Sequence, residues 1–183
     1  FLKGLTLGTA GAAVVALTID EDGMAKDVES KLRVARRLYD FAVNQHGLPP
    51  EDLMFDPLTF TICTGNSDDR ELGLETLNAI KLLAEEFPAC QIVLGLSNIS
   101  FGLNAVARHV LNSVYLEHAL RQGMTGAIVH VSKIVPFHSI PEDERHVTED
   151  LIFNRRGSTG VGSDGNPDYE PLHAFMALFE DRK

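Results

Sequence analysis

Residues 90–104 read "CQIVLGLSNISFGLN", an apolar run that breaks into small polar residues. The run has the length of a buried strand, and the next helical pattern begins only near residue 105. A simple connection would need no more than a turn. Here Asn98 stands at the break, and its side chain both donates and accepts hydrogen bonds. Since α/β proteins place ligands at the carboxyl ends of their strands, Asn98 is predicted to bind one.

The same alternation of a short apolar run and a longer helical pattern occurs along most of the chain. Strands are predicted near 12–19, 52–60, 90–96 and 126–131, and helices near 27–46, 70–88 and 105–122. Strand–helix units in succession predict a parallel sheet covered by helices, with the strands neighbouring one another in chain order. The glycine-rich residues 157–169 are predicted to be a flexible linker, and residues 170–183 a C-terminal amphipathic helix.

Composition narrows the classes of partner. The 183 residues carry a net charge of −10, which disfavours binding to nucleic acid or to an anionic membrane, and no apolar run is long enough to cross a bilayer. Cys63 and Cys90 fit no metal-binding or disulfide pattern, so we expect reduced thiols, no bound metal and a cytoplasmic protein. The first residues lack the methionine and the basic region of a signal peptide, and we expect an internal start.

Polar side chains follow each predicted strand. Asp56 lies too early to cap the helix near residue 70, so a binding role is favoured over a structural one. A carboxylate beside a carboxamide can recognise a flat heterocycle with adjacent N–H groups and a carbonyl, although a nucleotide or a sugar would also satisfy the pair. The other candidates at strand ends are Asp20, Ser97, Ser100, His130 and Lys133.

Four blocks carry a resemblance to a known family: "GAAVVALTIDEDGMA", "FDPLTF", "GLSNISFGLN" with "ARHVLNSVYLEHAL", and "GMTGAIVHVSKIVP". Together they resemble the pterin-binding domain of cobalamin-dependent methionine synthases, over about residues 11–156. Dihydropteroate synthases and corrinoid methyltransferases belong to the same superfamily. The resemblance implies a (β/α)8 barrel of the TIM type, of which residues 1–156 would supply strands five to eight.

The resemblance also implies roles for residues. Asp56 corresponds to the aspartate that hydrogen-bonds the pterin, and Asn98 to the asparagine that reaches N5, the nitrogen carrying the methyl group. Asn98 is thus the expected catalytic residue, and Asp56, Ser97, Ser100 and Asp20 are expected to bind substrate with it. The substrate would be 5-methyltetrahydrofolate. The methyl acceptor would be cob(I)alamin on another module, and a further module would bind homocysteine.

Some relatives have an arginine eight positions after the asparagine. This chain has Val106 there and an arginine at Arg108, so the role of Arg108 stays open. His118 and His130 are more readily explained as structural residues than as catalytic ones. Lys133 is interpreted either as a solvated side chain or as a contact to the glutamate tail of folate.

Two other functions compete with methyl transfer. Dihydropteroate synthase would need an arginine in the last strand, close to a serine or histidine, and "VHVSKIVP" has none. The second alternative is a non-catalytic half barrel that needs a missing N-terminal half or self-associates. Its first strand, near 12–19, would be a flat apolar edge that pairs with another copy.

Overall fold

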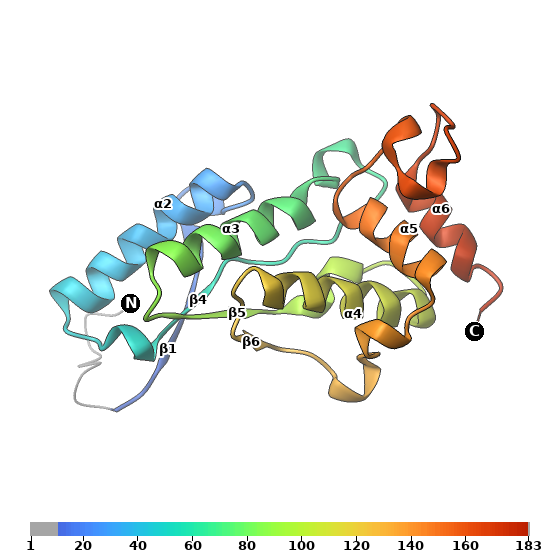
Figure 1. The fold of residues 1–183 in the computed structure, drawn as a ribbon. Helices are drawn as coiled ribbons and strands as arrows, with labels where there is room; N and C mark the ends of the chain where they lie inside the picture. Colours follow the sequence, from blue (N-terminus) through green and yellow to red (C-terminus); the bar gives the residue numbers. More distant parts are fainter. Residues whose placement is uncertain (1–10, 183) are drawn as a thin grey trace.

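A computed structural model of the chain describes residues 11–182 and contains a parallel four-stranded sheet (Figure 1). The strands, in spatial order, are β1 (Val14–Leu17), β4 (Leu53–Asp56), β5 (Gln91–Leu94) and β6 (Gly126–Ala127). Every neighbouring pair is parallel, which confirms the order predicted from the sequence. All four carboxyl ends therefore meet at one edge of the sheet.

Each strand except the last is followed by a helix of the expected position. These are α2 (Val28–Tyr39), α3 (Leu72–Glu86) and α4 (Ala105–Arg121), and α2 packs on α3 (Figure 1). Asp27 caps α2, accepting from the Ser30 N–H at 2.8 Å, and Asn104 caps α4 in the same way. A π-helical turn, Asp40–Gln45, extends α2 towards the predicted end near residue 46.

Only one face of the sheet is covered by helices. Leu53 and Phe55 of β4 are fully buried, as expected for side chains that point towards α2 and α3. β1 has the same alternation: Ala16 is buried beside Phe55, whereas Val15 is 50% exposed and Leu17 44% exposed on the opposite face. The register sets Leu17 beside Asp56, so both lie on the open face. The sheet is thus an open partial barrel, whose inner surface is not closed by further strands among residues 11–182.

The C-terminal part adds two helices, α5 (Glu142–Ile152) and α6 (Pro171–Phe179). They pack on each other and on α4, at one end of the molecule (Figure 1). The sequence pattern had predicted α6 but not α5. The sequence pattern also did not predict a short antiparallel hairpin, in which the two-residue strands β2 (Ile19–Asp20) and β3 (Gly23–Met24) pair.

Residues 157–169, for which a flexible linker was predicted, contact α5. They form two short 3-10 turns, Gly157–Thr159 and Val161–Ser163, and the following Tyr169 is buried. The Tyr169 hydroxyl donates to Asp150 of α5 at 3.1 Å, and the Gly162 N–H donates to the same carboxylate at 2.9 Å. The buried carboxylate therefore fixes the segment on α5, and the glycines allow the close packing.

Further 3-10 turns lie in the connections, at Pro50–Asp52, Ser67–Asp69, Leu96–Ser100, Val131–Lys133 and Phe137–Ser139. The third of these follows β5 directly and contains Asn98. Within residues 11–182, no helix combines the length and the apolar character needed to cross a membrane.

Candidate functional site

Asp56 is the last residue of β4 and lies on the open face of the sheet, beside Leu17 of β1. Its Oδ1 accepts a hydrogen bond from the Leu58 N–H at 2.9 Å. Burial raises the pKa of Asp56, while the Leu58 N–H and the nearby Lys31 charge act in the opposite direction. The second carboxylate oxygen has no hydrogen-bond partner within residues 11–182, so one acceptor is available for a ligand.

Lys31 of α2 is fully buried behind this loop. Its Nζ donates to three backbone carbonyls: that of Ala25 at 2.9 Å, that of Pro57 at 2.5 Å and that of Leu58 at 3.3 Å. Burial lowers the pKa of Lys31 to about 8, against the charges of Asp27, Asp56 and Glu75. Lys31 thereby holds the turn after Asp56, in which Leu58 adopts a left-handed conformation with φ of 64°.

Asn98 lies in the 3-10 turn Leu96–Ser100, and its carboxamide makes no hydrogen bond to any residue from 11 to 182. The side chain is exposed and reaches back over Gly95, where an added Cβ would lie 3.4 Å from Asn98 Nδ2. The absence of a side chain at Gly95 leaves room for this conformation. Asn98 can therefore both donate to and accept from a ligand at the carboxyl end of β5.

Arg108 of α4 fixes the turn that carries Asn98. Its Nη2 donates to the Ser97 carbonyl at 3.2 Å, and its Nε donates to Ser100 Oγ at 3.1 Å. Ser100 is fully buried and also donates to the Ser97 carbonyl at 3.2 Å. Ser97 is half-buried beside Asn98. The structure thus places Ser97 at the surface of the site and Ser100 beneath it.

Two hydrogen bonds join the loop after Asp56 to the turn that carries Asn98. The Ile62 N–H donates to the Ile99 carbonyl at 3.3 Å, and Thr61 Oγ1 donates to the Phe101 carbonyl at 2.8 Å. Since β4 and β5 are paired neighbours, the two candidate side chains project from adjacent strand ends on connected loops. The structure thus connects the loop that follows Asp56 with the turn that carries Ser97 and Asn98.

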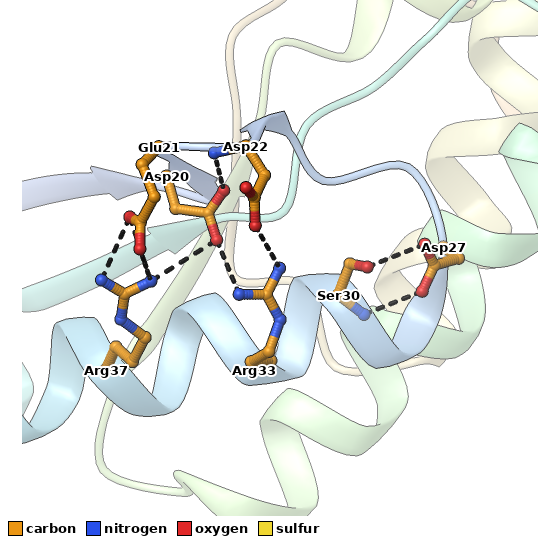
Figure 2. A network of polar contacts seen from close by, with 7 residues as sticks. All are labelled: Asp20, Glu21, Asp22, Asp27, Ser30, Arg33 and Arg37. Carbon is orange, nitrogen blue, oxygen red and sulfur yellow. Dashed lines mark hydrogen bonds and ion pairs between the residues drawn. The ribbon is translucent and has the colours of Figure 1, made fainter.

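Asp20 is held elsewhere. Figure 2 shows its carboxylate between Arg33 and Arg37 of α2, with Arg33 Nη1 at 2.8 Å and Arg37 Nη1 at 3.5 Å. Although burial tends to raise the pKa of Asp20, the Asp22 N–H and the arginines lower it overall. Glu21 and Asp22 extend the network to the same arginines. The carboxylate of Asp20 is therefore engaged with α2 and joins the β2–β3 hairpin to that helix.

The remaining histidine, lysine and cysteine side chains are described by their burial and their nearest contacts. His118 lies 3.0 Å from Glu149 and packs edge-on against Phe153, in agreement with the structural interpretation. His130 and Lys133 are exposed at the carboxyl end of β6. Burial raises the pKa of Cys63 to about 12 and that of Cys90 to about 11, so both thiols stay protonated near neutral pH.

Sequence reasoning missed Lys31 and left Arg108 unassigned. Lys31 falls among the apolar positions of α2 together with Leu32 and Ala35, where a charged residue is unusual. The place of Lys31 on the apolar side of the helix was the one feature of the sequence that could have indicated its structural role. Nothing in the sequence gave the partners of Lys31, because the carbonyls that it binds belong to segments six and 26–27 residues away.

Comparisons with known proteins show the family of the chain as a whole. A family model described as "Pterin binding enzyme" matches residues 6–130. The chain is 47% identical over 170 residues to the methionine synthase of Mycobacterium tuberculosis (strain ATCC 25618 / H37Rv), covering 93% of this chain. It is 48% identical over 181 residues to the methionine synthase of Mycobacterium leprae (strain TN), covering 98% of this chain.

In each case the chain spans 14% of the length of the relative. The parallel strand–helix units agree with the barrel fold that the resemblance implied, here as an open partial barrel. More than half of the sequence lies within the family match. This chain belongs to the family of pterin binding enzymes.

Proposed function

We propose that this chain binds 5-methyltetrahydrofolate and presents the N5-methyl group for transfer to cob(I)alamin carried by another module. The reaction would be part of methionine synthesis, as the names of the relatives indicate. One observation carries the proposal: Asn98 is exposed at the carboxyl end of β5, and its carboxamide has no partner within residues 11–182. A pterin nitrogen would supply that partner.

The roles follow from hydrogen-bonding capacity. During transfer the N5–methyl bond breaks, its electron pair stays on N5, and the methyl group passes to the acceptor. The tertiary amine leaves more readily when N5 is protonated, and water is the proposed source of that proton. The Asn98 carbonyl can accept from N5–H, and its amide can donate to the neutral nitrogen. Asn98 would thus supply positioning and electrostatic assistance.

Asp56 would anchor the ring by accepting from pterin N–H groups. Its environment supports this, because the carboxylate is half-buried and one oxygen is already oriented by the Leu58 N–H. Ser97 would offer a further polar contact. Ser100 and Asp20 enter the proposal as residues that shape the surrounding loops, since both are engaged within the protein.

The substitution Asn98→Ala in the full-length protein tests this assignment of Asn98. The methyl-transfer rate should fall by about 100-fold, as when one preorganised polar group is removed from an active site. The folate Kd should change much less, because Asn98 acts mainly on the nitrogen whose charge changes. Asn66→Ala is the control, since Asn66 is exposed in the loop after β4 and its carboxamide makes no hydrogen bond to residues 11–182. An unchanged rate with a raised Kd would refute the assignment of Asn98 to N5.

A second candidate is a non-catalytic half barrel that self-associates. The exposed side chains Val15, Leu17 and Ile128 favour it, because they form apolar surface at the uncovered sheet. Calorimetric titration with 5-methyltetrahydrofolate, together with the mass in solution, separates the two candidates. Dimers without folate binding would favour the second function, and folate binding would favour the first.

A further inference from the structure

Basic side chains gather at a surface pocket next to the turn that carries Asn98. The pocket has a volume of about 210 Å³ and lies between α4 and the 3-10 turn Val131–Lys133. Arg108 and His109 of α4 line it on one side, and His130 and Lys133 on the other. These side chains come from two segments that are far apart in the sequence but follow neighbouring strands.

No carboxylate compensates these four basic groups. None of them forms an ion pair with any residue of the described range 11–182, although the chain as a whole carries a net charge of −10. Burial, and then the charges of Lys133, Arg108 and His130, lower the pKa of His109. His109 is therefore mostly uncharged at neutral pH, and Arg108 and Lys133 supply the positive charge that would attract an anion to the pocket.

Asn112 is an independent sign of a missing ligand. It lines the same pocket, is only 6% exposed, and makes no side-chain hydrogen bond to residues 11–182. A buried polar group without a partner costs about 1–3 kcal/mol, so such groups are rare in folded proteins. The buried atom without a partner is the acceptor Oδ1, so it calls for a donor such as an amide N–H of the ligand, while the carboxylate itself would be bound by the basic side chains.

We propose that this pocket binds a carboxylate of the glutamate tail of the folate substrate. The inference rests on the proposed function and extends it to a part of the ligand distant from N5. Ser97, the neighbour of Asn98, lines the pocket, so the ring site and the pocket are adjoining. The volume is below the roughly 300–1,000 Å³ of sites that enclose a whole drug-sized ligand. It suits one end group of a longer molecule.

General precedent supports an anion at this place. In (β/α)8 barrels the loops after the last two strands often hold an anionic group. By the resemblance described above, β5 and β6 correspond to those strands. The acidic chain would otherwise repel a substrate with two or more carboxylates, and the basic pocket offsets that repulsion locally.

The test compares three ligands in the product of the complete gene. They are 5-methyltetrahydropteroate, which lacks glutamate, and the mono- and triglutamate forms of 5-methyltetrahydrofolate. Calorimetry at low salt should show the monoglutamate binding about tenfold more tightly than the pteroate form, as for a few charge-assisted hydrogen bonds. Added salt should reduce the difference, because exposed charges are screened.

Lys133→Gln should reduce the preference for the monoglutamate over the pteroate form severalfold. The double variant Lys133→Gln/His109→Gln should nearly abolish that preference. Lys81→Gln, an exposed lysine on α3, is the control and should leave the preference unchanged. Equal affinity of the wild type for all three ligands would overturn the pocket assignment alone. An undiminished preference for the monoglutamate over the pteroate form in the folded double variant would also overturn the pocket assignment. Failure of the wild type to bind any of the three would instead contradict the proposed function itself.

Discussion

Asp56 and Asn98 would divide recognition of the pterin between a charged acceptor and a neutral amide. Asp56→Asn keeps the shape but loses the charge that accepts ring N–H groups. We expect the folate Kd to rise by about tenfold or more, since hydrogen bonds to charged groups contribute about 1.5–3 kcal/mol. Calorimetric titration measures it. A Kd within twofold of the wild type would show that Asp56 does not bind the ring.

Lys31 should support this site through stability. Lys31→Met leaves the carbonyls of Ala25, Pro57 and Leu58 without their donor, at a cost of about 2 kcal/mol at neutral pH. Urea unfolding measures the loss. The apolar substitution keeps the volume of the side chain, so an unchanged urea midpoint would show that the carbonyls find other partners.

The same lysine should give stability a pH dependence. Burial lowers the pKa of Lys31 to about 8 in the folded chain, from an ordinary value of 10.5. Between these values the unfolded chain binds the extra proton, so raising the pH favours the folded state. From pH 7.5 to pH 10 the wild type should gain about 2 kcal/mol over Lys31→Met. An equal difference at both pH values would mean that Lys31 titrates normally.

At the scale of residues, the sequence predicted the polar strand ends but not their contacts. Asp56 and Asn98 are the predicted binding residues because each stands where an apolar strand stops without a helix to cap. Asp20 met the same criterion, yet its carboxylate is bound by Arg33 and Arg37 of α2. Spacing along the chain shows that a polar group lies at a strand end. It does not show whether a side chain from a distant part of the sequence binds that polar group in the folded protein.

At the scale of elements, the connection 157–169 is fixed by one buried carboxylate. Tyr169→Phe removes the hydrogen bond to Asp150 and should cost about 1–2 kcal/mol. Trypsin should then cleave faster near Arg155 and Arg156, at the start of the connection. Tyr39→Phe is the control, because its hydroxyl has no hydrogen bond to residues 11–182. Equal digestion of both variants would contradict an anchoring role for the hydroxyl.

Strands and long helices were predictable because hydrophobic periodicity encodes which side is buried. The helix α5 was missed although acidic residues follow Pro141, as at many helix starts. The connection 157–169 was expected to be flexible because composition alone favours disorder in glycine-rich segments. Its order depends on Asp150 and Tyr169, which the sequence pattern does not link.

At the scale of the whole molecule, the uncovered sheet face should drive association of this chain when it is studied by itself. Leu17→Lys places a charge on that face and should weaken self-association roughly tenfold. Analytical ultracentrifugation over a range of concentrations measures it. Leu82→Lys is the matched control, since Leu82 is 38% exposed on the outer helix α3. A wild-type chain that is monomeric at every concentration would contradict the prediction.

The strand order has a consequence for synthesis on the ribosome. Each strand of the parallel sheet pairs with the strand of that sheet that precedes it in the chain, in the order β1, β4, β5 and β6. No strand has to be inserted between two that are already paired. The sheet can therefore grow at one edge as translation proceeds, and each new helix can cover the latest strand before the next appears. A nascent chain of this kind exposes a single growing edge at any moment.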